Sequence, residues 1–235
     1  MSCILHIETS TDVCSVALSQ DGLCIDERVE TNGPSHAQVL PAFVEEMISF
    51  ADNHAIPLDA VAISSGPGSY TGLRIGTSTA KGVCYGRNIP LIAIPTLKIL
   101  STPVLLFEED MPDDALLCPM LDARRMEVYT AVYDRALNCH EEVKAFVVEP
   151  ESFSELLEKK HVYFLGNGAE KCKEVIKHPH AHFIDDIRPI ARNMYPLAER
   201  AFMRKQFVDT AYFEPFYLKE FVAGVQKTLL TTQQS

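Results

Sequence analysis

The chain has 235 residues, of which 47% are hydrophobic and 23% charged, and its formal net charge is −11 at pH 7. This length suits one large domain or two lobes of about 100 residues each. No apolar run approaches the roughly 18 residues of a membrane span, and the N-terminus has no basic segment of a signal peptide, so we expect neither. The acidic balance disfavours direct binding of nucleic-acid phosphates, so a nucleic acid would be met through a more basic partner.

The cysteines and histidines give no sign of a metal site. Seven cysteines are scattered along the chain without a CxxC pair. This pattern indicates reduced core thiols in a cytoplasmic protein. His178, His180 and His182 alternate along the chain, and we interpret them as isolated surface histidines.

The first half of the chain predicts a meander followed by alternating helices and strands. Residues 3–8, 13–19 and 23–29 are typical of strands, and Asp21-Gly22 indicates a tight hairpin. A helix of about 18 residues, capped by Ser35, follows them. Residues 59–64 then predict a strand, 69–85 a helix and 90–94 a strand. The element order is β-β-β-α-β-α-β.

The second half repeats this order in shorter form. Strands are predicted over 116–121, 127–133 and 142–148, then a helix over 151–159, a strand over 161–165, a helix over 169–177 and a strand over 182–184, with a last helix over 194–206. Two such units predict an α/β fold of two ribonuclease-H-like lobes, of the actin, sugar-kinase and Hsp70 type. We expect a first lobe over 1–101, a linker over 102–114, a reduced second lobe over 115–223 and a polar tail over 224–235.

The most distinctive segment is SSGPGSYTGLRIG, residues 64–76, between a predicted strand and a predicted helix. Backbone amides at such a turn can hold an anion, although no Walker lysine follows. In the helix, Gly72, Gly76 and Ala80 leave one face without large side chains. That face suits packing inside the lobe or contact with a partner helix, and the sequence alone favours neither.

The end of the first predicted strand offers a second candidate site. In this fold an acid and a hydroxyl-rich turn at that place meet a phosphate and its metal, and here the turn is Glu8-Thr9-Ser10-Thr11. Asp122 and Arg124 stand at the matching place in the second half. An ordinary hairpin turn explains the same residues, because threonine, serine and aspartate favour turns.

Several of these segments together resemble the bacterial TsaB (YeaZ) family. They are SSGPGSYTGLRIG at 64–76 with AKG at 80–82, IETST at 7–11, SH at 35–36, LP at 40–41, MLDARRMEVY at 120–129, GNGA at 166–169 and PFYL at 215–218. The resemblance implies a two-lobed actin-like ATPase fold and a part in making N6-threonylcarbamoyladenosine in tRNA. It implies a non-catalytic subunit that dimerises with a catalytic TsaD-type subunit, with a TsaE-type ATPase also required.

Catalytic relatives carry an H-x-x-x-H metal pair after the strand that follows the glycine-rich helix, and here Thr96 and Leu100 take its two positions. Neither side chain replaces an imidazole at a transition metal, so we expect no catalysis by this chain alone and no metal. The alternative is a stand-alone actin-fold ATPase or glycoprotease-like peptidase. The family usually has aspartate where this chain has Glu8, which weakens a nucleotide site.

The resemblance also implies roles for particular residues and partners. The expected partner-interface residues are His36, Leu40, Phe43, Tyr70, Gly72, Leu73, Ile75, Gly76, Ala80 and Val83. The expected vestigial nucleotide-binding residues are Glu8, Thr9, Ser10, Thr11, Asp122, Arg124, Gly166 and Gly168. We expect a homodimer when the partner is absent, contact with tRNA only through the complex, and ATP used by the complex without a cofactor in this subunit.

Overall fold

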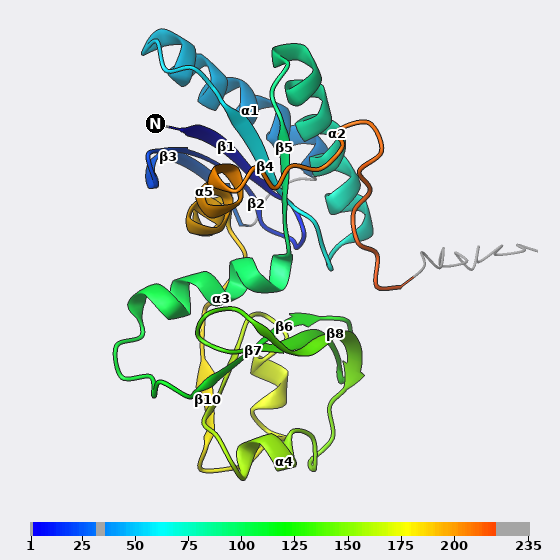
Figure 1. Ribbon diagram of the computed structural model, residues 1–235. Helices are drawn as coiled ribbons and strands as arrows, with labels where there is room; N and C mark the ends of the chain where they lie inside the picture. The colour runs from blue at the N-terminus through cyan, green and yellow to red at the C-terminus, as the bar shows by residue number, and fades with distance from the viewer. Residues whose placement is uncertain (1, 32–35, 220–235) are drawn as a thin grey trace, which may run out of the picture.

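Two five-stranded sheets, one above the other in Figure 1, divide this computed structural model into two lobes. The structure describes residues 2–31 and 36–219. The strand order is β3-β2-β1-β4-β5 in the first lobe and β10-β9-β6-β7-β8 in the second. When the second order is reversed, it matches the first strand by strand. The predicted fold class of two ribonuclease-H-like lobes is therefore confirmed.

The first lobe follows the predicted order. Its elements are β1 (Cys3–Glu8), β2 (Cys14–Gln20), β3 (Leu23–Glu30), α1 (His36–Asn53), β4 (Ala60–Ser64), α2 (Tyr70–Arg87) and β5 (Leu91–Ile94). Asp21 and Gly22 both have positive φ and form the tight turn that their sequence predicts. Strand β1 lies at the centre, antiparallel to β2 and parallel to β4, and every residue in it is buried. Ser35, the predicted cap of α1, lies outside the described residues.

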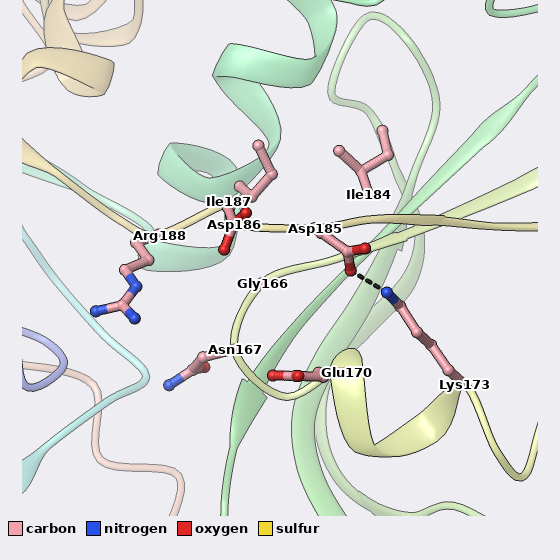
Figure 2. Close-up of a pocket in the computed structure, with 9 residues that line it drawn as sticks. All are labelled: Gly166, Asn167, Glu170, Lys173, Ile184, Asp185, Asp186, Ile187 and Arg188. Carbon is pink, nitrogen blue, oxygen red and sulfur yellow. Dashed lines mark hydrogen bonds and ion pairs between the residues drawn. The ribbon is translucent and has the colours of Figure 1, made fainter.

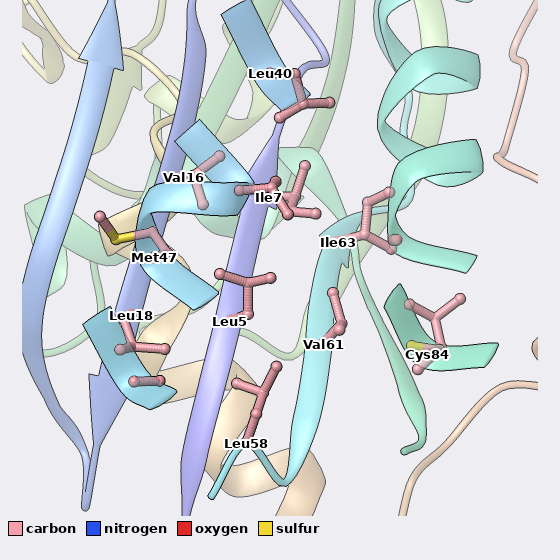
Figure 3. Packing of buried hydrophobic residues seen from close by; sticks show 14 of the residues in the cluster. Leu5, Ile7, Val16, Leu18, Leu40, Met47, Leu58, Val61, Ile63 and Cys84 are labelled. Atoms are coloured by element: carbon pink, nitrogen blue, oxygen red, sulfur yellow. The ribbon is translucent and has the colours of Figure 1, made fainter. Parts of the chain in front are cut away.

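Helices α1 and α2 lie side by side on one face of the first sheet (Figure 1). The buried residues of α1 are Leu40, Val44, Met47 and Ala51, which form one apolar stripe along the helix. Figure 3 shows Leu40 and Met47 packed over the side chains of the sheet. Burial of such a side chain stabilises the fold by about 1.5–3 kcal/mol. The inner stripe of α1 thus belongs to the core of its own lobe.

The second lobe has the same sheet but shorter helices. Its elements are β6 (Leu116–Asp122), β7 (Glu127–Tyr133), β8 (Cys139–Val147), α4 (Ser154–Leu157), β9 (Val162–Leu165), the 3-10 turn η1 (Glu170–Cys172) and β10 (Ala181–Ile184). The helices predicted over 151–159 and 169–177 shrink to single turns. Phe153 has a φ of 63°, outside the helical region, so α4 starts only after it. The expected reduction of this lobe is therefore visible in its helices.

A helix that the sequence does not predict lies between the lobes. Helix α3 (Thr96–Phe107) contains Pro103 and takes up the first half of the expected linker. Its residues Leu97 and Leu100 pack in the second lobe, whereas Ile99 packs in the first. The expected boundary at residue 101 therefore falls inside a helix that both lobes share.

The chain returns to the first lobe after β10. The 3-10 turn η2 (Ala191–Met194) and helix α5 (Tyr195–Met203) cover the face of the first sheet opposite α1 and α2, where Met194 and Ala198 pack against Ile4, Ala62 and Ile92. The helix predicted over 194–206 is confirmed in shorter form. The expected second lobe of 115–223 is wrong at its end, because residues 191–208 pack on the first lobe. The predicted tail, 224–235, lies outside the described residues.

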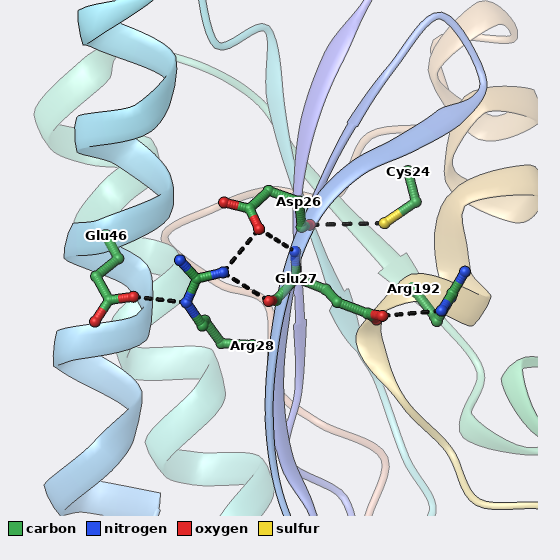
Figure 4. Close-up of polar contacts among 6 residues, drawn as sticks. All are labelled: Cys24, Asp26, Glu27, Arg28, Glu46 and Arg192. Carbon is green, nitrogen blue, oxygen red and sulfur yellow. Dashed lines mark hydrogen bonds and ion pairs between the residues drawn. The ribbon is translucent and has the colours of Figure 1, made fainter.

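Two ion pairs tie the edge strand β3 to the layers on its two sides (Figure 4). Arg28 donates to Glu46 of α1 at 2.7 Å, and Arg192 of η2 donates to Glu27 at 2.8 Å. Partly exposed pairs of this kind contribute at most about 1 kcal/mol each. They hold the edge of the sheet between α1 and the returning chain.

After α5 the chain runs along the outside of the first lobe, past β5 and α2 (Figure 1). The amide of Val208 donates to the carbonyl oxygen of Leu91 at 2.9 Å. Residues 209–219, which we name the strap, follow along α2, where Lys81 donates to the carbonyl oxygen of Ala211 at 2.9 Å. The described chain ends at Lys219.

Most of the thiols belong to the core. Cys3, Cys14, Cys84, Cys118 and Cys172 are buried, as predicted, whereas Cys24 is half-buried and Cys139 is exposed. Burial raises the pKa of Cys3 and of Cys84 to about 11, so both thiols stay neutral at physiological pH. Within 2–31 and 36–219, no helix is both long and apolar enough to cross a membrane.

Candidate functional site

The glycine-rich loop after β4 is joined to the turn after β1. The amide of Ser69 donates to the carbonyl oxygen of Ser10 at 2.6 Å. Ser69 also caps α2, because its hydroxyl accepts from the amide of Gly72 at 3.2 Å. These are two of the amides that an anion at the start of α2 would use. Internal partners already take them, which weakens the interpretation of this loop as a phosphate cradle.

The small-residue face of α2 points into the lobe. A Cβ at Gly72 would overlap the carbonyl oxygen of Thr9, and one at Gly76 would overlap the Thr9 hydroxyl. Ala80 is fully buried in the first-lobe core. The expectation that Gly72, Gly76 and Ala80 leave a surface free for a partner helix is therefore wrong. They are small because the turn after β1 lies directly against them.

Glu8 ends β1 and is completely buried. One carboxylate oxygen, Oε1, accepts from the amide of Ser10 at 2.5 Å, whereas Oε2 and the hydroxyls of Ser10 and Ser64 are buried without a hydrogen-bond partner among the described residues. Burial raises the pKa of Glu8 to about 7, and hydrogen bonding to Ser10 opposes the rise. A half-protonated carboxyl that solvent does not reach is a poor partner for a phosphate-bound metal.

The other residues of this turn serve the fold. The buried Thr9 donates to the carbonyl oxygen of Gly72 at 2.8 Å. Thr11 is half-buried, and its hydroxyl accepts from the amide of Val13 at 3.3 Å. These contacts favour the structural interpretation of the turn, while nucleotide binding by it stays a prediction.

The matching turn of the second lobe is held in a similar way. The side-chain oxygen of Asn167 accepts from the amide of Asp122 at 3.0 Å, and Lys171 forms an ion pair with the Asp122 carboxylate. A Cβ at Gly168 would lie 2.8 Å from the carbonyl carbon of Leu121, so this glycine permits a close backbone approach. Arg124 is exposed.

A pocket of about 290 Å³ opens beside this turn, at the carboxyl ends of β9 and β10 (Figure 2). Its lining residues are Gly166, Asn167, Glu170, Lys173, Ile184, Asp185, Asp186, Ile187 and Arg188. Three carboxylates face two cations, and Lys173 is already paired with Asp185. The excess of negative charge disfavours a phosphate here.

The expected partner-interface residues divide into two groups. The buried group is Leu40, Gly72, Leu73, Gly76 and Ala80. The group that reaches the surface of α1 and α2 is His36, Phe43, Tyr70, Ile75 and Val83, all partly exposed. The buried group cannot touch another molecule without unfolding the lobe, so the candidate surface is the outer side of the helix pair.

The outer stripe of α2 is the surface that the sequence prediction missed. Thr71, Arg74, Ser78, Gly82 and Tyr85 are exposed and recur every three or four residues along the helix. The Tyr85 side chain is 89% exposed, which is high for an aromatic residue. The signal was present in the sequence, because this stripe lies opposite the glycine face.

The two positions aligned with the metal-binding histidines of catalytic relatives are both buried. Thr96 begins α3, and Leu100 packs in the second-lobe core. Among the residues that the structure describes, no group of three or more histidines, cysteines or carboxylates has a geometry that could hold a metal ion.

The histidines in and just before β10 are not isolated, which corrects the sequence interpretation. His161 Nδ1 lies 2.7 Å from His182 Nε2, and the rings of His161 and His180 are 4.4 Å apart. Burial and the neighbouring histidines lower the pKa of His182, so it resists protonation near neutral pH.

The repeated sheet and the paired turns define a two-lobed α/β protein of the actin-like class. A crystal structure of a protein from Pseudomonas aeruginosa described as similar to the peptidase YEAZ matches it with a TM-score of 0.78 at 26% identity, over 93% of this chain and all of that one. The structure described as YeaZ from the same organism matches over the same shares with a TM-score of 0.77 at 26% identity.

Sequence comparison places the chain more closely. The model of the family described as "TsaD: tRNA N6-adenosine threonylcarbamoyltransferase" matches residues 30–227. The tRNA threonylcarbamoyladenosine biosynthesis protein TsaB of Escherichia coli is 30% identical over 94% of this chain and 96% of its own length. TsaB of Bacillus subtilis is 32% identical over 74% of this chain and 75% of its own length. The chain belongs to the family that this model describes and, within it, to the TsaB proteins.

Proposed function

We propose that this chain is the non-catalytic subunit of the complex that makes N6-threonylcarbamoyladenosine beside the anticodon of tRNA. Its relatives from Escherichia coli and Bacillus subtilis carry the name of that biosynthesis, which supports the pathway. The chain dimerises with a catalytic TsaD-type subunit. A TsaE-type ATPase and the tRNA join through the assembled complex, which uses the ATP.

The outer surface of the α1–α2 pair carries this proposal. Tyr85 and Arg74 are exposed on α2, and Phe43, Ile75 and Val83 reach the surface beside them. Aromatic residues and arginine are enriched at protein interfaces, where an amphipathic helix pair gives a preformed platform. The same surface on two copies of the chain supports a homodimer when the catalytic partner is absent.

The chemistry of the remaining candidates supports an accessory role. Thr96 and Leu100 have no imidazole to offer a metal. Asp122 is engaged by Lys171, and Glu8 is buried with a pKa near 7. These features weigh against the alternative, a stand-alone actin-fold ATPase or glycoprotease-like peptidase, which needs a reactive group open to its substrate.

Reconstitution of adenosine modification from purified subunits tests the proposal. We expect little modified tRNA without this chain and full modification when it is added. A TsaD-type subunit that works equally well alone would overturn the accessory role. A purified preparation of this chain that hydrolyses ATP or a peptide by itself would instead support the alternative.

A further inference from the structure

The strap joins the glycine-rich loop through its backbone. The amide of Phe216 donates to the carbonyl oxygen of Ser65 at 2.7 Å. The next residue of the loop, Gly66, has a φ of +103°, and a Cβ there would overlap the carbonyl oxygen of Phe216. Pro215 is buried beside this contact. The loop is therefore shaped to receive an extended segment of its own chain, which explains a glycine that neither a phosphate nor a partner helix required.

Side chains extend the same contact to α2. The Tyr217 ring lies 4.7 Å from the ring of Tyr70, the first residue of α2. The Arg74 guanidinium lies 4.6 Å from the centre of the Tyr70 ring on the same helix. Aromatic and cation–π contacts of this kind add to the area that they bury. The side chains of Tyr217, Tyr70 and Arg74, in contact in that order, thus hold the strap against the start of α2.

The last described residue of the strap reaches the other lobe. Lys219 forms an ion pair with Glu127, the first residue of β7. Figure 1 shows the strap coming down beside α2 to the level between the lobes, whereas α3 crosses between the lobes on the other side. The strap therefore adds a non-covalent connection between the lobes to the two backbone connections, through α3 and through the segment from β10 to η2. A hinge rotation about α3 requires the strap contacts to break.

We propose that the strap is a latch that fixes the two lobes relative to each other. With the latch closed, the glycine-rich loop, the start of α2 and β7 move as one body. With the latch open, the lobes separate about α3, and the loop loses the segment that covers it. This inference concerns the isolated chain and does not depend on the proposed partner.

The distance between the lobes tests the latch directly. Cys139 is exposed in the second lobe and accepts a spin label, and Ser78→Cys provides a second label on the exposed side of α2. Cys24→Ser removes the half-buried thiol. We expect a narrow distance distribution in this background. Lys219→Glu, which repels Glu127, should broaden the distribution and shift it to longer distances. It should also speed deuterium exchange at the Phe216 amide about tenfold.

Two further variants separate the latch from a general effect of charge. Combining Lys219→Glu with Glu127→Lys restores an opposite-charge pair and should restore the narrow distribution. Lys177→Glu breaks the exposed Lys177–Glu174 pair within the second lobe and should leave the distribution unchanged. Phe216→Pro removes the amide that bonds to Ser65, so it opens the latch without a change of charge. An unchanged distribution in both Lys219→Glu and Phe216→Pro would overturn the proposal.

Discussion

The Thr9 hydroxyl donates a hydrogen bond to the carbonyl oxygen of Gly72 at 2.8 Å and thereby joins the end of β1 to the first turn of α2. The contact is possible because Gly72 and Gly76 have no side chain to hold the turn away. A stripe of small residues that looks like a docking surface is, in this fold, the place where one segment of the chain packs on another. The docking surface that we propose lies on the opposite side of the helix.

Gly76→Ala tests this close approach. The new Cβ would overlap the Thr9 hydroxyl and come within 3.4 Å of Ile63. Overpacking of this kind costs about 1–3 kcal/mol. We expect the free energy of unfolding, measured by urea denaturation, to fall by that amount.

Gly82→Ala is the matched control in the same helix, because nothing lies within 4 Å of the added Cβ. Alanine is a better helix former than glycine, so this variant should gain about 0.5–1 kcal/mol. Adding Thr9→Ala to Gly76→Ala should recover part of the lost stability, since it removes the overlapping hydroxyl. Equal losses from Gly76→Ala and Gly82→Ala would contradict the packing argument.

Glu8 should make stability depend on pH. Burial raises its pKa from the ordinary 4.5 to about 7 in the folded chain. The folded state therefore binds this proton more tightly than the unfolded state does. The stability that protonated Glu8 contributes is fully present below pH 4.5 and is lost as the pH rises through 7. Glu8→Gln stays neutral at every pH. We therefore expect its free energy of unfolding, relative to that of the wild type, to rise by about 3 kcal/mol between pH 4.5 and pH 8. Urea midpoints at four pH values measure the difference.

The comparison with Glu8→Gln is needed because a second buried group has the opposite effect. Burial lowers the pKa of His6 to about 3, so the stability it contributes is present above pH 6.5 and lost as the pH falls toward 3. His6 is present in both proteins, and its contribution cancels in their difference. A difference that stays constant with pH would show that Glu8 is ionised in the folded state at neutral pH.

Tyr85→Asp tests the proposed partner surface. A charge in place of an exposed aromatic anchor should weaken binding to the TsaD-type subunit at least tenfold, the effect typical of an interface hot spot. Phe107→Asp is the control, because Phe107 is 77% exposed on α3, away from the α1–α2 pair. Calorimetric titration should find that Phe107→Asp binds the TsaD-type subunit with the affinity of the wild type. Equal affinity for both variants would move the interface away from α2.

A titration with Mg-ATP tests the proposed absence of nucleotide binding in this subunit. The internal bonds of Ser69 and Thr9 and the acidic pocket beside Asn167 predict no measurable heat at millimolar nucleotide. Binding that disappears in both Glu8→Ala and Asp122→Ala would instead show that the two turns still form a nucleotide site.

Local signals in the sequence predicted the elements well where they act alone. The Asp21-Gly22 pair fixes its hairpin because both residues accept positive φ, and the apolar stripe of α1 fixes the face that it buries. Helix α3 escaped prediction because Pro103 and the acids after Phe107 suggest a linker, whereas burial against both lobes stabilises the helix.

The candidate site was harder to predict, because contacts between residues distant in sequence decide which of its residues are buried. A glycine stripe has the same pattern whether a partner or the chain itself covers it, and Gly72 meets Thr9 across 63 positions. The role of Gly66 depends on Phe216, which no local pattern connects to it. The Tyr85 stripe could have been found, since it is the side of α2 away from the glycines.

The return of residues 191–203 to the first sheet also determines when this protein can fold during its synthesis. One face of that sheet, with Ile4, Ala62 and Ile92, is covered by η2 and α5. During synthesis the ribosome makes the strands of the first sheet before the second lobe, and makes η2 and α5 only after it. This face of the first sheet therefore stays exposed until the second lobe has been made. We therefore expect the first lobe to finish folding only after Ala191–Met203 has been made, and a chain truncated before Ala191 to expose an apolar sheet prone to aggregation.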